Sequence, residues 1–355
     1  MSSGGRADGP VLMVDWLGRG GIAHCTEVWV HELRAAGESV ELVTRPGREL
    51  AKAVPDSYGA GHIGGALPQY LAVVAQARRL VRELEPRALV LHGTVLPQIE
   101  MGLLRAAHRR NSTVILVAHE PAPPHDVPGA RPALARLISE ADVVIAHTSF
   151  VAGQIRALTG RHDLNLLPLP IPIGLIAAGL GAVPVVEPSP VPLALLFGNL
   201  HRAYKGSITV EQLATRGVDD WRFALVGKGA PASLAGATTV PRFLDAGELV
   251  ATVSSSAATL LPYTRASQSA AVVLAQALGS VVVATSVGGI PEQVEDGVTG
   301  RLVPLGAGVE RWRDVLIELR DPQEQARLAF AARKSVERAH AEFTAGVLEL
   351  VRAVR

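Results

Sequence analysis

Cationic and polar residues gather directly after one apolar run in the middle of the chain. The segment FGNLHRAYKGS presents Asn199, His201, Arg202 and Lys205 within seven positions. Two cations at the end of a strand can neutralise a diphosphate, because guanidinium and ammonium groups form charge-assisted hydrogen bonds with phosphate oxygens. A solvated basic loop without a ligand is the alternative interpretation.

A second candidate lies further along, in YTRASQSAAVVLAQALGSVVVATSVGGIPEQVEDGVTGRLV. Ser267 or Ser269 can cap a helix here, and the N-terminus of that helix offers unpaired N–H groups and a partial positive charge to an anion. Gln276 follows Ser269 by seven residues, two helical turns, and so returns to the same face. An exposed Gln276 without a ligand is the alternative, since most glutamines are exposed.

A glycine-rich turn stands near the beginning of the chain, in VDWLGRGGIAH. Gly18, Gly20 and Gly21 follow a strand and precede a helix, so free N–H groups meet a backbone that side chains leave open. This arrangement suits phosphate or a polar sugar. A plain turn is the alternative, and the spacing differs from the dinucleotide fingerprint G-x-G-x-x-G.

His119 and Glu120 follow another apolar run and precede prolines that stop a helix. His119 is placed to donate a hydrogen bond to a ligand, although a structural histidine is the commoner outcome. The histidines of the first half show no spacing typical of metal ligands, and we predict no metal. These histidines are His24, His92, His119, His125 and His147.

These residues can share a site only if strands end beside them. The sequence predicts two series of alternating strands and helices. Short runs rich in Val, Ile and Leu, separated by segments of helical periodicity, are typical of parallel strands with crossover helices. Ligands bind at the carboxyl ends of such strands. Prolines and glycines break the pattern at residues 168–192. The expected strands are PVLMVD, SVELVT, ALVLHG, TVILVAHE and ADVVIAH, then LALLFGN, RFALVG, AATLLPY, SVVVAT and GRLVP.

We therefore predict an α/β fold of two Rossmann-like, doubly wound parallel-sheet domains, residues 1–180 and 181–335. The segment 336–355 closes the chain as an amphipathic helix. No short-period repeat interrupts this plan.

Composition narrows the function classes. The chain has 355 residues and a net charge of +1, so no large field draws it to nucleic acid or to anionic lipid. The single cysteine, Cys25, excludes an internal disulfide, and the segment MSSGGRADGP lacks the features of a secretion signal, so we expect the cytoplasm. Pro and Gly interrupt the longest apolar runs, so none is typical of a membrane span. The segment LLRAAHRR indicates at most a weak peripheral membrane contact, and a solvated helix face is more typical.

The chain resembles the retaining glycosyltransferases of family 4, which have the GT-B fold of two facing Rossmann-like domains. The resemblance covers nearly the whole length. It is carried by GRGGIAHCTEVWVHELRAAGESVELVT, by LFGNLHRAYKG, by ALVGKGA and above all by LPYTRASQSAAVVLAQALGSVVVATSVGGIPEQVEDGVTGRLVP.

The resemblance implies a role for several positions. The glycine turn would lie beside the donor diphosphate and sugar, His119 near the transferred sugar, and the final helix would return to the first domain. Family members clamp the phosphates with an Arg and a Lys six residues apart; Lys205 stands at the Lys position, Asn199 replaces the Arg, and Arg202 is a substitute. The turns at Gly227 and at Arg242 to Leu244 would surround the nucleotide base. Together, the residues and the resemblance assign donor binding to Gly20, Gly21, Asn199, Gly227, Lys228, Arg242, Phe243, Leu244, Ser269, Ala270, Ala271 and Gln276, and catalysis to His119, Arg202, Lys205 and Gln268.

Gln268 and Gln276 stand where family members usually have two glutamates, one on sugar hydroxyls and one on the ribose. A neutral hydrogen bond is weaker than a charged one, so each replacement weakens donor binding by about 1 kcal/mol, roughly fivefold. Part of that loss is offset because fewer negative charges face the diphosphate. The amides would suit an amino or deoxy sugar.

We predict a retaining glycosyltransferase that moves a hexosyl or amino-sugar group from a nucleoside-diphosphate donor to a hydroxyl of a small biosynthetic acceptor. We expect the donor to be a UDP-sugar, and we expect no metal or other cofactor. A catalytically degenerate GT-B protein that binds nucleotide or a partner without turnover is one alternative, and a sugar-nucleotide epimerase is another. We expect a monomer or homodimer that binds no nucleic acid. The loops 47–65 and 121–130, expected to choose the acceptor, show no interpretable pattern.

Overall fold

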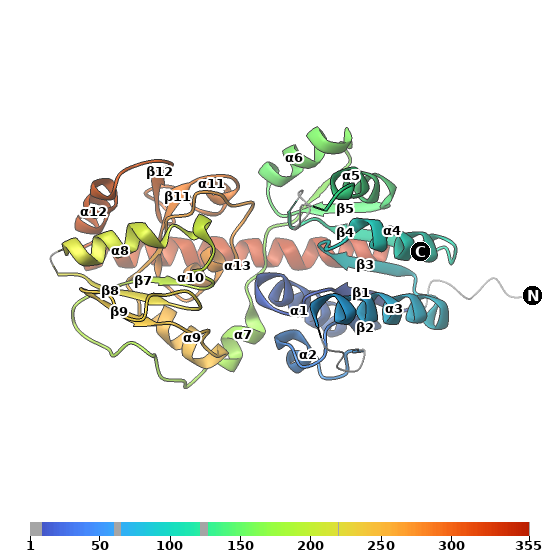
Figure 1. Cartoon of the computed structure of the whole chain (residues 1–355), viewed down its shortest axis with the longest axis horizontal. Coiled ribbons are helices and arrows are strands. Elements are labelled where there is room, and N and C mark those ends of the chain that lie inside the picture. Colours follow the sequence, from blue (N-terminus) through green and yellow to red (C-terminus); the bar gives the residue numbers. More distant parts are fainter. Residues whose placement is uncertain (1–8, 60–64, 121–126, 219, 355) are drawn as a thin grey trace, which may run out of the picture. The chain divides into compact units, whose positions relative to one another are not determined.

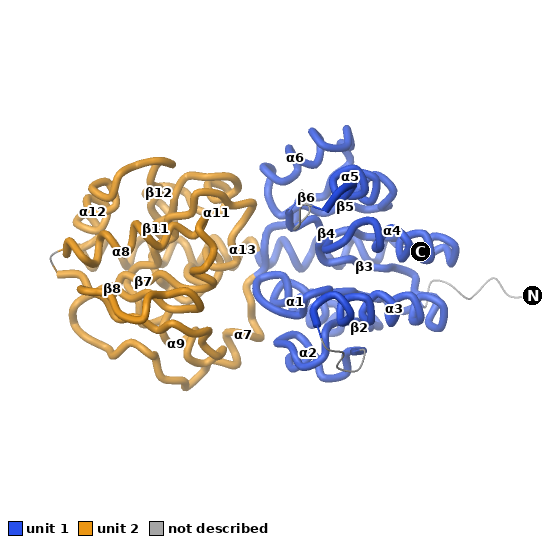
Figure 2. Tube along the Cα trace, in the orientation of Figure 1, with its two compact units in different colours: residues 1–170, 340–355 blue, residues 171–339 orange. Residues whose placement is uncertain are grey.

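The computed structural model describes residues 9–59, 65–120, 127–218 and 220–354. It divides into two compact units, one of Met1–Pro170 with His340–Arg355 and one of Ile171–Ala339 (Figure 2). The sequence placed its domain boundaries at residues 180 and 335. The last helix, α13 (Pro322–Ala353), contributes residues to both units.

The first unit is a parallel sheet with helices on both faces, in the strand order β2-β1-β3-β4-β5-β6 (Figure 1). Its strands form because runs such as ALVLH in β3, apolar except for the final His92, are fully buried between the helix layers. The strands are β1 (Val11–Asp15), β2 (Val40–Val43), β3 (Ala88–His92), β4 (Thr113–Val117), β5 (Val143–Ala146) and β6 (Asn165–Leu166). The helices are α1 (Gly20–Ala35), α2 (Glu49–Ala53), α3 (Ala66–Leu84), α4 (Pro97–His108), α5 (Ala130–Glu140) and α6 (Ser149–Thr159).

The second unit repeats this plan in the order β12-β11-β10-β7-β8-β9. Its strands are β7 (Leu193–Phe197), β8 (Arg222–Val226), β9 (Ala237–Val240), β10 (Ala258–Leu261), β11 (Val281–Ser286) and β12 (Arg301–Pro304). Its other elements are α7 (Ile173–Ala178), the 3₁₀ turn η1 (Ala203–Lys205), α8 (Ser207–Arg216), α9 (Ala246–Ser254), α10 (Ala270–Ala277), α11 (Ile290–Gln293) and α12 (Val309–Glu318).

The predicted α/β class with two parallel, doubly wound sheets is confirmed. All ten expected strands form, and β6 and β9 are two that the sequence did not indicate. In each sheet the strand order reverses direction at one place, between β1 and β3 in the first unit and between β7 and β10 in the second. Ligands of open α/β sheets bind beyond the carboxyl ends of the strands at such a switch point. The loops after these four strands are therefore where each unit should carry its site.

Candidate functional site

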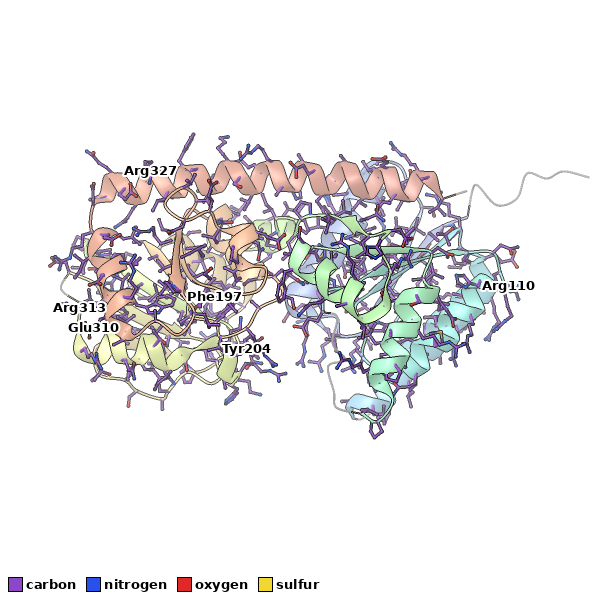
Figure 3. The ribbon with its side chains drawn as sticks, turned by 90° about the horizontal axis from the view of Figure 1, so that it is seen from above. Arg110, Phe197, Tyr204, Glu310, Arg313 and Arg327 are labelled. Atoms are coloured by element: carbon purple, nitrogen blue, oxygen red, sulfur yellow. The ribbon has the colours of Figure 1, made fainter. Side chains whose placement is uncertain are left out.

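Lys205 lies at the switch point of the second unit, where the loops after β7 and β10 meet. Its Nζ donates a short 2.5 Å hydrogen bond to Oη of Tyr263 and stands 3.9 Å from the centre of that ring. Tyr204, whose position in the loop after Phe197 is labelled in Figure 3, contacts Tyr263 edge to face, with ring centres 6.3 Å apart. Burial lowers the pKa of Lys205. Two tyrosines thus hold one partly desolvated ammonium group in a fixed place.

Close backbone contact brings these two loops together. Thr264 N–H donates to the Tyr204 carbonyl at 2.8 Å. Gly206 has φ +67°, and a Cβ there would lie 1.9 Å from the Pro262 carbonyl oxygen. Only glycine accepts both conditions, so Gly206 sets the distance between Lys205 and Tyr263.

The N-terminus of α10 adjoins this ammonium group. Ser269 is the N-cap residue in extended conformation, as predicted, but its hydroxyl does not cap the helix. The Ser269 side chain instead hydrogen-bonds Tyr263, the tyrosine that Lys205 contacts. The described residues offer no acceptor to the N–H groups of Ala270 and Ala271, the first in the helix. An ammonium group and two free helix N–H groups form an anion-binding arrangement.

Gln293, to which the sequence gave no role, holds that helix end in place. Its Oε1 accepts from Ser269 N–H at 2.7 Å, and its Nε2 donates to the Ser269 carbonyl at 3.2 Å. Its own carbonyl accepts from Nε2 of Gln276 at 3.0 Å. The Ser269 N–H, expected to help bind a donor, is therefore already used within the protein.

Gln276 is buried, with 1% of its surface exposed, so the exposed-surface alternative is wrong. Its Nε2 donates to the carbonyls of Gln293 and Thr299, at 3.0 and 3.4 Å. The amide nitrogen thus serves the packing of the second unit. A ligand contact by Gln276 would have to use Oε1.

The other residues expected around the phosphates lie in the same loops. Asn199 is half-buried, and its Oδ1 is buried without a hydrogen-bond partner among the described residues. Gln268 is half-buried just before the α10 cap. Arg202 is exposed and is the N-cap residue of η1, where its carbonyl accepts from Lys205 N–H at 2.8 Å. Arg265, which the sequence left without a role, is a second cation here, with its guanidinium carbon 5.1 Å from the Tyr204 ring centre.

The turns expected around a base are formed at the ends of β8 and β9. Gly227, with φ +135°, packs so closely on Gly198 that a Cβ would lie 1.8 Å from the Gly198 carbonyl oxygen. The carbonyl of Lys228 accepts from the N–H groups of Leu200 and His201. These contacts join the turn after β8 to the loop that contains Lys205.

Arg242, Phe243 and Leu244 follow β9. Both terminal nitrogens of Arg242 donate to the Glu248 carboxylate at 2.6 Å, so this guanidinium group is already paired. Phe243 is 56% exposed, and Leu244 is half-buried. An exposed aromatic ring just after the carboxyl end of a strand is suited to stack on a flat ligand.

In the first unit the glycine turn follows β1 as predicted. The Oδ1 atom of Asp15 accepts from the N–H groups of Leu17 and Gly18, at 2.9 and 2.7 Å, and this buried carboxylate shapes the turn. Burial raises the pKa of Asp15 despite these bonds. Gly20 and Gly21 are exposed at the start of α1, and Gly20 N–H donates to Oε2 of Glu49 at 2.9 Å. A carboxylate thus occupies one donor expected for a ligand.

His119 lies two residues after β4 and is buried at 5% exposure. It stacks near His92, with ring centres 6.1 Å apart, and near His147, at 4.9 Å. One ligand atom each of Cys25, His92 and His119 lie within 4.8 Å of one another. The sequence missed this cluster because its members come from separate elements. His125 and the segments 60–64 and 121–126 of the expected acceptor loops lie outside the described residues.

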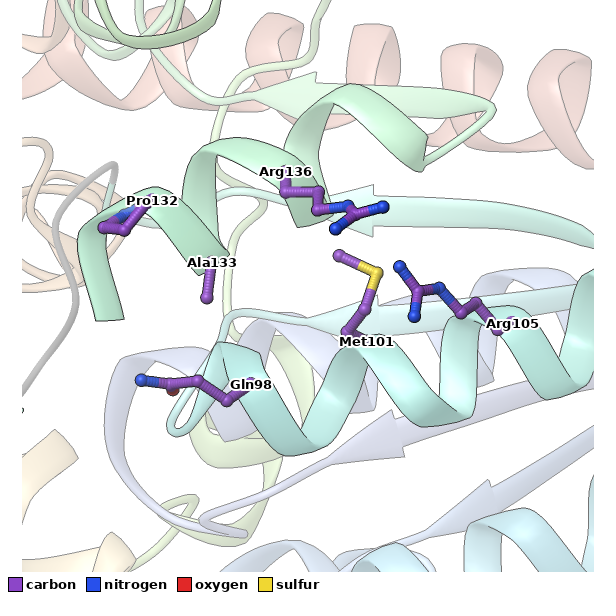
Figure 4. A pocket seen from close by; sticks show the side chains of 6 residues that line it. All are labelled: Gln98, Met101, Arg105, Pro132, Ala133 and Arg136. Carbon is purple, nitrogen blue, oxygen red and sulfur yellow. The ribbon is translucent and has the colours of Figure 1, made fainter. Parts of the chain in front are cut away.

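Two shallow hollows of about 300 Å³ lie elsewhere in the first unit. One, between α4 and α5, is lined by Gln98, Met101, Arg105, Pro132, Ala133 and Arg136 (Figure 4). Its two arginines share the Glu140 carboxylate. The other adjoins Thr113 and Asp142, at the amino ends of β4 and β5. No residue of a switch-point loop is among those that line either hollow.

The segment LLRAAHRR offers little to a membrane surface. Leu103 and Leu104 are fully buried in the core of the first unit, and Arg110 pairs with Glu85. None of the described helices combines the length and the apolar character that crossing a bilayer requires.

Comparisons with known proteins agree with this geometry. Residues 192–321 match the family model "Glycosyl transferases group 1". The structure is similar to sucrose-phosphate synthase from Thermosynechococcus elongatus, at 17% identity and TM-score 0.75, covering 97% of this chain and 98% of that chain. It is also similar to a glycosyltransferase from Rickettsia africae, at 15% identity and TM-score 0.73, covering 98% of both chains. A third similar structure is Anabaena HepE in complex with UDP and glucose, at 17% identity and TM-score 0.71, covering 97% of this chain and 98% of that chain. No curated protein matches the sequence.

The fold, with its two switch-point sheets, is the GT-B fold that these neighbours share. Its second unit contains a group 1 glycosyltransferase domain, in which Lys205 and the N-terminus of α10 lie.

Proposed function

We propose that the protein is a retaining, family 4 type glycosyltransferase. It transfers a hexosyl or amino-sugar group from a UDP-sugar to a hydroxyl of a small-molecule acceptor. The solved structures to which it is similar include HepE with UDP-glucose and a trehalose-6-phosphate synthase with UDP-2-fluoro glucose. These neighbours support a nucleotide-sugar donor, and the choice of UDP follows them.

The observation that carries the proposal is the contact chain from Lys205 through Tyr263 to Ser269. It places a partly desolvated ammonium group beside the open N–H groups of Ala270 and Ala271. Charge that develops on a departing diphosphate would be stabilised there by groups already in position. The chemistry therefore depends on the leaving group and requires no metal.

Further contacts complete the proposed donor site. Arg202 and Arg265 are the further cations in these loops, and Phe243 is the stacking surface for the base. Gln268 would orient the sugar, and Gln276 would reach the ribose through Oε1. From the resemblance we assign His119 and the Gly20–Gly21 turn to the sugar and diphosphate. The acceptor oxygen would attack on the face that the leaving group vacates, which retains the anomeric configuration.

The test is to incubate the protein with UDP-sugars and a panel of acceptors. Acceptor-dependent release of UDP, with a product of retained configuration by NMR, supports the proposal. UDP binding by calorimetry without product from any acceptor would instead support the degenerate GT-B protein, which Asn199, Gln268 and Gln276 motivate. Conversion of the donor alone would support an epimerase.

A further inference from the structure

Four buried side chains with metal-binding chemistry meet at the carboxyl edge of the first sheet. Cys25 lies on α1, His92 ends β3, His119 follows β4 and His147 follows β5. Their exposures are 3%, 1%, 5% and 7%. The ligand atoms of the first three lie within 4.8 Å of one another, and Nε2 of His147 is 4.0 Å from Sγ of Cys25.

The orientation of His147 suits a ligand. Its Nδ1 is 2.8 Å from the carbonyl of Leu167, so Nδ1 carries the proton and donates it there. The lone pair is then on Nε2, the nitrogen that faces Cys25. A histidine that binds metal commonly donates its other N–H to a backbone carbonyl in this way, which fixes the tautomer and the ring.

His92 supplies a second, independent observation. Both of its ring nitrogens are buried without a hydrogen-bond partner among the described residues. A buried polar group without a hydrogen-bond partner destabilises a fold. A bound ion is one of the few explanations for such a group in a native structure. A bound cation would satisfy the lone pair of this imidazole.

We propose that Cys25, His92, His119 and His147 bind one Zn²⁺ ion in a closed, structural site. One thiolate and three imidazoles form a tetrahedral donor set that Zn²⁺ accepts. Ideal zinc–ligand bonds put neighbouring ligand atoms about 3.4–3.6 Å apart. Cys25, His92 and His119, whose ligand atoms lie within 4.8 Å of one another, and His147, 4.0 Å from Sγ of Cys25, must therefore move closer together on binding. On binding, the Cys25 proton leaves to solvent and a zinc–sulfur bond forms, so each ion releases one proton and no electron is transferred.

This site shares one residue, His119, with the proposed sugar contact. It would tie the start of α1 to the ends of three neighbouring strands, and a bound His119 would keep its second nitrogen as an N–H donor. The proposal does not depend on sugar transfer, because metal content and spectra are measured without donor or acceptor.

The experiment uses the full, untagged chain purified without chelator. We expect about one zinc per chain by elemental analysis. After removal of zinc, Co²⁺ should give a thiolate-to-cobalt charge-transfer band and the visible bands of tetrahedral cobalt. Titration of the metal-free chain with Zn²⁺ in weak buffer should release about one proton per ion.

The variants are Cys25→Ser and His92→Gln, with His24→Gln as the matched control beside Cys25. Cys25→Ser should abolish the charge-transfer band, and His92→Gln should weaken zinc affinity at least tenfold, while His24→Gln should bind as the wild type does. Wild-type chain that is folded by circular dichroism but neither holds zinc nor gives the cobalt band would overturn the proposal. A band that persists in Cys25→Ser would overturn it equally. If a variant fails to fold, the zinc content, the cobalt spectrum and the proton release of the wild-type chain still test the proposal.

Discussion

The backbone N–H of Gly20 donates a 2.9 Å hydrogen bond to Oε2 of Glu49. The first turn of α1 therefore already holds an anionic group of its own chain, at the helix end where an anion is favoured. Glu49 is exposed and begins the short helix α2, so it can leave at small cost. We infer that it competes with a phosphate or sugar oxygen for this N–H.

Glu49→Gln tests this competition. We expect the KM for the sugar nucleotide to fall severalfold, because a neutral amide is a weaker acceptor and does not repel a diphosphate. The free energy of unfolding should fall by less than about 1 kcal/mol, which is the usual contribution of a charged group at a helix N-terminus. Steady-state kinetics with varied donor measures the effect. An increase in KM would show that Glu49 assists donor binding.

Lys205→Ala should weaken UDP binding by about 10- to 150-fold, since charge-assisted hydrogen bonds contribute about 1.5–3 kcal/mol. Isothermal calorimetry measures this loss. Lys205→Arg should restore part of the affinity but not all, because a planar guanidinium group does not fit the Tyr263 contact.

The same lysine predicts a pH dependence. Its pKa is lowered, so UDP affinity should begin to fall at a pH below the usual titration of lysine as the ammonium group loses its proton. In Lys205→Arg the alkaline fall should be absent, because arginine stays protonated. An unchanged alkaline fall in that variant would assign the titration to another group.

Phe243→Ala should weaken UDP binding by about 1–3 kcal/mol if the ring stacks on the base, as aromatic side chains do on nucleotide bases elsewhere. Phe330→Ala is the matched control, since Phe330 lies on α13 and is 68% exposed. Competition by UDP against a fluorescent nucleotide measures both. Equal effects of the two changes would contradict the assignment.

Gln276→Glu should destabilise the second unit. A carboxylate has no N–H to donate, so the carbonyls of Gln293 and Thr299 would each lose a donor, at about 1–3 kcal/mol for each buried group. The loss should grow as pH rises, since a buried carboxylate resists ionisation. Urea unfolding of this variant, with exposed Gln323→Glu as the control, measures it. Wild-type stability combined with faster turnover would mean that the amide is not structural.

Glu100 predicts a second pH dependence, in the first unit. Its Oε1 accepts from Tyr70 and from the N–H groups of Val95 and Leu96, and burial raises its pKa to about 7. The folded chain then binds a proton that the unfolded chain releases above its own pKa, near 4.5. This contribution to stability is complete below pH 4.5 and is lost as pH rises to 7, by about 1.4 kcal/mol per pH unit. Glu100→Gln should remove that slope from chemical unfolding curves, and a slope that persists would assign it elsewhere.

The strands were predictable because each one is a short run of apolar residues, which the sequence shows directly. β7 is apolar at every position and β3 at every position but the last, His92, and both strands are buried throughout. β9, with the sequence ATTV, has no fully buried residue and lies at the edge of its sheet, and β6 has two residues, so neither had a pattern to detect.

The site was predictable only where one loop contains it. Lys205 and the α10 cap each follow a strand, and the sequence places them there. Their connection depends on Tyr263, 58 residues after Lys205, and on Gln293, 24 residues after Ser269, and no local pattern links such pairs. The contact of Cys25 with His147 crosses 122 residues. A ligand cluster assembled from four elements has no fixed spacing for a sequence to show.

The approach of Gly206 to the Pro262 carbonyl also limits how the protein can be altered. Any larger residue at 206 would separate the two loops before it changed specificity, so random libraries that include this position would mostly return inactive clones. Directed evolution of donor choice should keep Gly206 constant and vary Arg265, Gln268 and Phe243, which already have long side chains.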